Sequence, residues 1–360
     1  MAVKKTIVNR KEDHIRICIE EGPVAKWNLL DCIEIVHNAL PEIDQDDIDL
    51  SRIFLGKQLS APLFIAAMTG GTPEGRKINE NLAATAAKTG IGMGVGSQRA
   101  ALENERLIAT YSVVSEFEIP LLMANIGMPQ LILAARRGGM NEVKDVIKRS
   151  LDMIGAGFIC IHLNYLQEAV QPEGEALARG GLEIIKNLCD DFSVVIKETG
   201  AGIDLDTITE LRAAGVTAVD VGGRGGTSFS AVEYFRSVQG NDQTGDLGKL
   251  LWDWGIPTPV VVKEAHGKLP LIATGGVRNA MDVFKLLSMG ADLVGLGRVL
   301  LEPAMMSEAE VTREIEKLIS GLKATMFLTG CATLSEIINV KKIYYPPLTY
   351  WIQQGTGKRN

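Results

Sequence analysis

Residues 270–298, PLIATGGVRNAMDVFKLLSMGADLVGLGR, place two short apolar runs on either side of an amphipathic segment. The runs PLIATGG (270–276) and ADLVGLG (291–297) are continuously apolar, which is typical of strands buried on both faces of a parallel sheet. The intervening segment Ala280–Met289 has the hydrophobic spacing of an amphipathic helix. The stretch therefore predicts a strand–helix–strand unit.

The same unit recurs along the chain from residue 62 onward. Helix-like stretches at 76–89, 175–189 and 204–214 separate the apolar runs. Eight evenly spaced units favour an α/β fold of the closed (β/α)8 TIM-barrel type over its competitor, a doubly wound sheet. Besides the two runs quoted above, the predicted strands are PLFIAAM (62–68), IGMGVGS (91–97), PLLMAN (120–125), GFICIHL (157–163), SVVIKE (193–198) and TAVDVGG (217–223).

Three segments lie outside the regular alternation. Residues 1–61 precede the first strand and form an N-terminal extension with two helix-like pieces. Residues 223–262 form a long, Gly-rich insertion between the sixth strand and the sixth helix, and loops of this length are usually lids or binding loops. We expect the barrel to occupy 62–330, with its last helix at 302–328, and a C-terminal tail over 331–360.

Composition excludes several classes of function. The net charge of −7 argues against a nucleic-acid partner, which requires a basic face. The five cysteines contain no CxxC pair, so they fit reduced thiols better than disulfides or a zinc site. The N-terminus lacks the apolar core of a signal peptide, and no apolar run approaches the ~20 residues that span a bilayer. We therefore expect a cytoplasmic protein with no membrane or nucleic-acid partner.

Polar residues or glycine pairs end every predicted strand. In a barrel these ends meet at one rim, where active sites lie. The run GFICIHLNYLQE (157–168) is an example, because it changes abruptly from apolar to polar; alone, such a cluster is equally compatible with a capped turn. The full set is Met68-Thr69, Ser97-Gln98-Arg99, Asn125, His162/Asn164/Gln167/Glu168, Lys197, Arg224/Thr227, Thr274-Gly275-Gly276 and Gly297-Arg298.

Three features of this rim suit an anionic cofactor or substrate. The glycines of 274–280 and 295–298 either make tight turns or let backbone N–H groups approach a phosphate, which the nearby arginines favour. Lys197 either pairs with Glu198 or Asp220, or faces a flavin, whose reduced anionic ring a cation stabilises. The basic stretch 10–16, RKEDHIR, is either a solvated helix start or an anion clamp, for which Arg99 is a second candidate.

Several motifs closely resemble those of type 2 isopentenyl-diphosphate isomerases, over about residues 9 to 330. They are RKEDHI, AMTGGT, GMGVGSQR, NIGMPQL, HLNYLQEAVQPEGE, IKETGAGI, GGRGGT and WGIPT. The resemblance implies an FMN-containing barrel that interconverts isopentenyl and dimethylallyl diphosphate in isoprenoid biosynthesis. It also implies a requirement for reduced FMN and Mg2+, NADPH as a reductant, and a homotetramer or larger assembly.

The resemblance also implies roles for individual residues. Gln167, beside the reacting carbons, would be catalytic together with Lys197 and His162, and Glu168 would bind Mg2+. FMN would be held by Ala67, Met68, Thr69, Ser97, Asn125, Lys197, Thr227, Gly276, Arg278, Gly297 and Arg298. The substrate would be bound by Arg10, Lys11, His14, Ser97, Gln98, Arg99, His162, Asn164 and Gln167.

Three positions depart from the family pattern. Tyr165, Gly222 and Arg224 stand where Pro, Ser and Gln are more usual, which affects the expected flavin contacts rather than the activity. The matched motifs offer no Cys, His–Asp pair or carboxylate pair as a strong acid. The hypothesis is that reduced FMN carries the proton at N5, with Lys197 supporting its anionic form and Gln167 orienting the substrate or sharing the transfer.

Three alternatives remain. An FMN-dependent 2-hydroxy-acid oxidase or dehydrogenase needs a base at the end of the sixth strand, typically the His of HGGR, where this chain has VGGR (221–224). An inosine-monophosphate-dehydrogenase-like enzyme needs a Cys after that strand, and the insertion contains none. A non-enzymatic binding barrel would not need Lys197, Glu168 and the basic N-terminus together.

Overall fold

The centre of the molecule is a closed barrel of eight parallel strands in the order β10-β11-β4-β5-β6-β7-β8-β9. The computed structural model describes residues 2–240 and 245–358. The predicted (β/α)8 barrel is confirmed, and each predicted strand forms. The strands are β4 (Leu63–Ile65), β5 (Gly92–Gly94), β6 (Leu122–Gly127), β7 (Phe158–Leu163), β8 (Val194–Glu198), β9 (Ala218–Asp220), β10 (Leu271–Thr274) and β11 (Leu293–Leu296).

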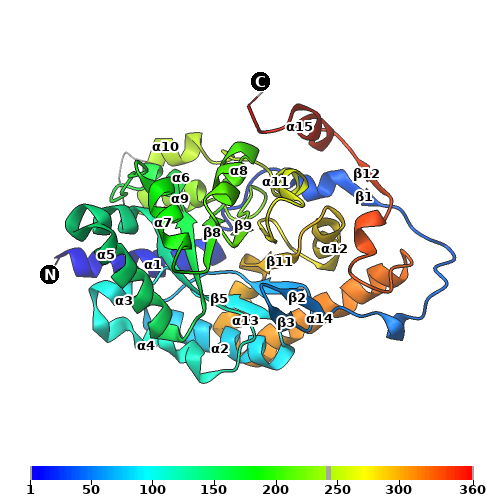
Figure 1. Cartoon of the computed structure of the whole chain (residues 1–360), viewed down its shortest axis with the longest axis horizontal. Coiled ribbons are helices and arrows are strands. Elements are labelled where there is room, and N and C mark those ends of the chain that lie inside the picture. Colours follow the sequence, from blue (N-terminus) through cyan, green and yellow to red (C-terminus); the bar gives the residue numbers. More distant parts are fainter. Residues whose placement is uncertain (1, 241–244, 359–360) are drawn as a thin grey trace.

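Helices surround the barrel, and polar caps fix where several of them begin (Figure 1). The Asn279 side chain accepts a hydrogen bond from Asp282 N at the start of α12, and Ser307 accepts one from Glu310 N at the start of α14. The cap at Ser307 divides the helix predicted at 302–328 into two, so that prediction of one continuous helix was wrong. The helices are α2 (Pro73–Thr89), α3 (Arg99–Glu103), α4 (Ala109–Ser112), α5 (Met128–Ile154), α6 (Tyr165–Val170), α7 (Gly181–Cys189), α8 (Leu205–Ala213), α11 (Thr258–Ala265), α12 (Ala280–Ser288), α13 (Leu301–Met306) and α14 (Glu308–Phe327).

A hairpin of the N-terminal extension closes the end of the barrel at which the strands begin. Its strands are β2 (Arg52–Phe54) and β3 (Lys57–Leu59). Phe54 and Leu59 pack into the apolar cluster inside the barrel, and Arg52 pairs with Asp292, just before β11. The opposite end, where the strands finish, is left for the functional site.

The extension and the tail are integrated with the barrel. The extension begins with α1 (Ala2–Glu20), and its β1 (Ile33–Ile35) pairs antiparallel with β12 (Lys342–Tyr344) of the tail, which ends in α15 (Leu348–Gln354). The insertion at 223–262 is mostly helical, containing α9 (Phe229–Gly240), α10 (Gly245–Leu250) and the start of α11; its residues 241–244 lie outside the described part. In the described part, no helix has both the length and the apolar character needed to cross a bilayer.

Candidate functional site

A cavity of about 910 Å³ lies at the ends of the barrel strands. Its wall combines the loops after the strands with α1 and the start of α9. Every residue to which the resemblance gives a role lines it except Gln98, and Arg224 of the predicted rim lines a smaller pocket instead. The amide of Gln98 is instead buried against the barrel wall, donating to Ser150 O at 2.9 Å and accepting from Asn125 N at 2.8 Å. The side chain of Gln98 therefore does not line the cavity, and its contact with substrate stays a prediction.

The loops after β10 and β11 form an open cradle at one end of the cavity. The backbone N–H groups of Gly276, Val277 and Arg298 have no hydrogen-bond acceptor within the described residues. A Cβ built on Gly297 would meet no atom within 4 Å and would occupy this open space. Free amides and space beside a glycine are what a phosphate group requires. The residues at this end therefore fit the phosphate of a nucleotide cofactor.

The two arginines predicted for the phosphate differ in their partners. Arg278 is engaged by two carboxylates, Asp31 at 2.5 Å and Asp282 at 2.9 Å. The hydrogen bonds that Arg278 donates, first to Asp282 and then to Asp31, raise the pKa of Arg278 above its usual range. Arg298 forms no ion pair with the described carboxylates. Arg298 is thus the stronger candidate for a new anion.

Lys197 and His162 lie at the centre of the cavity floor. Lys197 Nζ donates to Asp220 Oδ2 at 2.8 Å, and both side chains are buried, so the pairing with Asp220 foreseen as one alternative is present. His162 Nδ1 lies 2.7 Å from Asn125 Oδ1, while Asn125 Nδ2 donates to Val95 O at 3.0 Å. This arrangement makes Nδ1 the protonated nitrogen, leaving Nε2 as an acceptor.

His162 is neutral at physiological pH. Burial, followed by the charges of Lys197 and Lys11, lowers the pKa of His162 to about 3. A neutral imidazole can hydrogen-bond a ligand, but it does not provide positive charge to a diphosphate. His162 lines the cavity, as predicted, whereas its catalytic role stays a prediction.

Glu168 is the centre of a group of oxygen atoms. Its carboxylate accepts hydrogen bonds from Asn164 Nδ2 at 2.9 Å, Gln171 Nε2 at 2.8 Å and Glu175 N at 2.6 Å. Asn164 Oδ1 and Gln171 Oε1 are buried without a hydrogen-bond partner in the described structure. A carboxylate beside two unpartnered amide oxygens is a donor set suited to Mg2+. No group of three or more His, Cys, Asp or Glu that could hold a metal exists among the described residues, so Glu168 would bind the metal without such a cluster.

The basic residues at the substrate side are also unequally engaged. Lys11 Nζ donates to Gly70 O at 2.7 Å, Ser97 O at 3.0 Å and Tyr111 Oη at 2.5 Å, which uses all three protons. Burial, and then the charge of Arg10, lowers the pKa of Lys11 to about 7. Lys11 therefore fastens α1 to the loops after β4 and β5, in addition to lining the cavity.

Arg99 and Arg10 complete this side of the cavity. Arg99 makes a two-pronged ion pair with Glu175, with distances of 3.0 and 3.1 Å, and a further bond to Glu103. Arg10 has no carboxylate partner among the described residues. A substrate diphosphate would find Arg10 available, whereas Arg99 would have to be shared with Glu175.

Glu233 of α9 was not predicted, and it organises two residues that were. Its carboxylate accepts from His14 Nε2 at 2.9 Å, Gln167 Nε2 at 3.3 Å and Arg236 Nη1 at 2.6 Å. Burial acts to raise the pKa of Glu233, but the bonds from His14 and Gln167 and the charges of His14 and Arg236 outweigh it and lower the pKa to about 2. Glu233 lies in the insertion 223–262, which is expected to be a lid or binding loop from its length, and this is the sequence feature that could have identified it.

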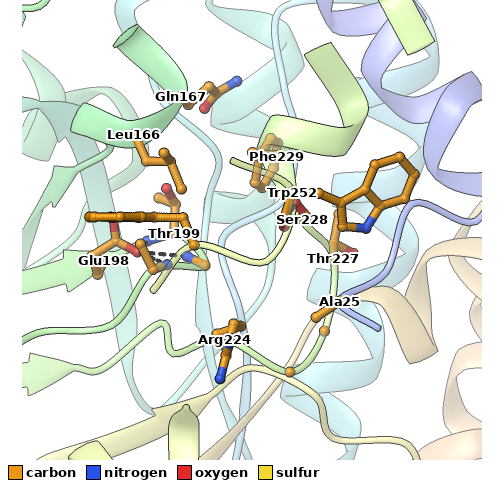
Figure 2. A pocket seen from close by; sticks show the side chains of 15 residues that line it. Ala25, Leu166, Gln167, Glu198, Thr199, Arg224, Thr227, Ser228, Phe229 and Trp252 are labelled. Carbon is orange, nitrogen blue, oxygen red and sulfur yellow. Dashed lines mark hydrogen bonds between the residues drawn. The ribbon is translucent and has the colours of Figure 1, made fainter. Parts of the chain in front are cut away.

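A small side pocket adjoins the cavity near Gln167 (Figure 2). There Glu198 Oε2 accepts the backbone N–H groups of residues 199–202, at 2.5 to 3.2 Å. Burial raises the pKa of Glu198 to about 7 despite these bonds. Gly222 packs on the same strand end, with φ of +44° and a Cβ position only 1.8 Å from Glu198 O. The backbone around residue 222 therefore leaves no room for the side chain of a Ser at this position.

Comparisons of sequence identify relatives over nearly the whole chain. An isopentenyl-diphosphate delta-isomerase of Picrophilus torridus is 42% identical over 348 residues, covering 96% of this chain and 99% of that protein. One from Archaeoglobus fulgidus is 45% identical over 348 residues, covering 95% and 97%. The sequence pattern of the family described as FMN-dependent dehydrogenase matches residues 191–342.

Solved structures support the fold. A lactate oxidase of Pediococcus acidilactici is 17% identical and matches with a TM-score of 0.60, covering 88% of this chain and 84% of that one. A mandelate oxidase variant matches with a TM-score of 0.59 at 17% identity, covering 88% and 89%. At this identity the likeness concerns the barrel alone.

Proposed function

The chain belongs to the isopentenyl-diphosphate delta-isomerase family of enzymes, and from that premise we propose that it interconverts isopentenyl and dimethylallyl diphosphate using reduced FMN and Mg2+. The observation that carries the proposal is the cavity itself. It combines a cradle of free amides at one end with an oxygen-rich group around Glu168 at another. A flavin phosphate and a metal-bound diphosphate are two anions that such a cavity can hold together.

The cofactor would lie with its phosphate at Gly276, Gly297 and Arg298. Along the cavity towards Lys197, the remaining contacts would be those predicted, from Ala67, Met68, Thr69, Ser97, Asn125 and Thr227, with Arg278 at the rim. When bound, reduced FMN would supply the proton donor and acceptor for shifting the double bond. Lys197, whose Nζ lies 2.8 Å from Asp220 Oδ2, would favour the anionic form of the ring.

The substrate would lie between α1 and the loop after β7. Arg10 would provide the available positive charge, with His14 and Arg99 beside it, and Glu168 would hold Mg2+ against the diphosphate. His162 Nε2 and the amide of Asn164 would contribute hydrogen bonds. Gln167, held by Glu233, would orient the hydrocarbon end; as a neutral amide it suits positioning better than acid catalysis.

One experiment tests the proposal. The purified protein should bind FMN, lose its yellow colour when reduced with dithionite, and convert isopentenyl diphosphate only when FMN is reduced and Mg2+ is present. NADPH should replace dithionite as reductant. Absence of flavin binding, or equal turnover with oxidised FMN, would overturn the proposal. The cytoplasmic location and the homotetrameric or larger assembly stay predictions.

An FMN-dependent 2-hydroxy-acid oxidase is the second candidate because the FMN-dependent dehydrogenase pattern matches residues 191–342. The residue at the position of the required base is Val221, which is fully buried and cannot accept a proton. Lactate and mandelate should therefore leave the oxidised flavin unchanged. Bleaching of the flavin by either acid would favour this candidate.

A further inference from the structure

A segment of the N-terminal extension, residues 23–31, crosses the rim of the cavity, and we call it the rim strap. At one end, Ala25 N donates to Gly226 O and Ser228 N donates to Pro23 O, both at 2.8 Å. Figure 2 shows Ala25 of the strap beside Thr227. At the other end, Lys285 Nζ of α12 donates to Leu30 O at 2.9 Å. The strap thus connects the loop after β9 with α12, the helix that follows the loop after β10.

Asn28 of the rim strap contacts the glycine turn of the cradle directly. Its Nδ2 donates to Gly276 O at 2.7 Å, and its Oδ1 accepts from Leu30 N at 3.1 Å. A Cβ on Gly276 would lie 2.9 Å from Asn28 Nδ2, and one on Gly225 would lie 3.1 Å from Asn28 Oδ1. The carboxamide therefore fills the space between two glycine turns from different loops.

The bond from Asn28 fixes the orientation of one peptide group. Gly275 and Gly276 have φ values of +122° and +81°, and glycine turns of this kind have several accessible orientations. In a trans peptide the C=O of Gly276 and the N–H of Val277 point in opposite directions. Holding the Gly276 carbonyl towards the strap therefore directs the Val277 N–H away from it, and that N–H has no acceptor among the described residues.

We propose that Asn28 is a positioning residue for the cofactor phosphate, holding the Gly276–Val277 peptide in the orientation that presents its N–H to that phosphate. The inference rests on the proposed FMN site and adds a residue outside the barrel to it. Preorganised donors bind an anion more tightly than donors that must be ordered on binding. The N-terminal extension would accordingly contribute to FMN affinity as well as to substrate binding.

Two variants of the full chain test this role. Asn28→Ala removes both hydrogen bonds, whereas Asn28→Asp keeps the bond from Leu30 N but replaces the donor to Gly276 O with an acceptor. We expect FMN, titrated into the apoprotein and followed by flavin fluorescence, to bind about tenfold more weakly to Asn28→Ala, as loss of a hydrogen bond and of preorganisation implies. Asn28→Asp should be weaker still, because its carboxylate repels the carbonyl oxygen and the phosphate.

Asn38→Ala is the matched control. Asn38 lies in the same extension and also accepts a bond from the N–H two residues later, Leu40 N at 3.1 Å, but it is exposed and does not line the cavity. It should bind FMN as the unchanged chain does. With FMN saturating, the turnover number of Asn28→Ala should stay within about twofold, since a positioning role concerns binding.

The outcomes separate this inference from the proposed function. Weak FMN binding by both Asn28 variants, with thermal melting of their apoproteins unchanged, supports the inference. If the unchanged chain binds FMN and Asn28→Asp binds it equally well, the role of Asn28 is wrong while the proposed function stands. If the unchanged chain itself binds no FMN, the proposed function fails first.

Discussion

Glu168→Gln separates the metal site from the flavin site. The substitution removes one negative charge and preserves the size and planarity of the side chain. Mg2+ would lose the charge of its proposed protein ligand, and the described residues contain no group of three or more His, Cys, Asp or Glu that could hold the metal instead. The neighbouring amide oxygens of Asn164 and Gln171 would remain.

The structure indicates a small effect of Glu168→Gln on folding. The new carbonyl oxygen can accept from Gln171 Nε2 and Glu175 N, as Glu168 Oε2 does. The new amide group then faces Asn164, whose unpartnered Oδ1 can rotate to accept from it. With the hydrogen bonds conserved, the free energy of unfolding should fall by less than about 1 kcal/mol. Glu168→Ala would instead leave buried donors unsatisfied, at about 1–3 kcal/mol each.

The effect of Glu168→Gln on metal dependence should be large. Loss of outer-shell partners weakens metal sites by about 10–100-fold, and loss of a charged ligand should reach the upper end. A 100-fold rise in the Mg2+ concentration for half-maximal rate corresponds to about 2.8 kcal/mol, at about 1.4 kcal/mol per factor of ten. Initial rates with isopentenyl diphosphate, reduced FMN and varied Mg2+ measure it.

The control for Glu168→Gln is Glu183→Gln on α7. Glu183 likewise accepts from an asparagine amide, Asn187 Nδ2 at 3.0 Å, but lies outside the cavity. It should retain the Mg2+ response of the unchanged enzyme. If Glu168→Gln loses FMN while keeping its Mg2+ response, Glu168 serves the flavin and the assignment is refuted.

Three further predictions concern the cavity floor and the cradle. Asp220→Asn should lower the free energy of unfolding by about 3 kcal/mol, because Lys197 loses its buried partner. It should also raise the flavin midpoint potential, because the carboxylate that offsets the positive charge of Lys197 is removed; a lower potential in a spectroelectrochemical titration would contradict the role of Lys197. Gly297→Ala should weaken FMN binding at least tenfold in a fluorescence titration, because the added Cβ enters the space proposed for the phosphate. The apoprotein should still fold, since that Cβ meets no protein atom within 4 Å. Unchanged FMN affinity would place the phosphate elsewhere. His162, whose pKa is lowered to about 3, takes up a proton near pH 6.5 only in the unfolded chain. Its contribution to the free energy of unfolding is therefore complete above pH 6.5 and decreases towards pH 3, by about 2 kcal/mol at pH 5. Urea unfolding at pH 7 and pH 5 should show a smaller decrease in this free energy for His162→Gln than for the unchanged chain, and equal decreases would argue against a neutral buried histidine.

The barrel could be predicted from the sequence because its strands are buried on both faces. Continuous apolar runs such as 157–163 and 193–198 indicate strands that are buried on both faces, and the spacing between successive runs leaves room for helical connections. The helix break at Ser307 and the helices within 223–262 depend on local caps and on packing against neighbours, which periodicity does not report.

The site could be located from the sequence but its charge balance could not. Strand ends and glycine turns are visible as residues, so the rim was predictable. Which cation is free depends on partners distant in sequence, as Asp31 is from Arg278 and Glu175 is from Arg99. The burial of the Gln98 amide has the same cause, since its acceptor, Ser150 O, belongs to α5, 52 residues further along the chain. Asn28 lies in a segment without any motif.

The turn formed by residues 171–175 gives a physical reason for the two motifs HLNYLQE and QPEGE to occur together. Gln171 and the backbone N–H of Glu175 both donate to Glu168, and the side chain of Glu175 holds Arg99. Gly174 lets the turn fold back, because a Cβ there would lie 1.9 Å from Glu168 O. The candidate metal ligand and the candidate anion-binding arginine are therefore attached to one turn. A substitution at Glu168 should therefore also disturb Arg99, and a substitution at Arg99 should also disturb Glu168. The effects of the two substitutions on the free energy of diphosphate binding should not be additive.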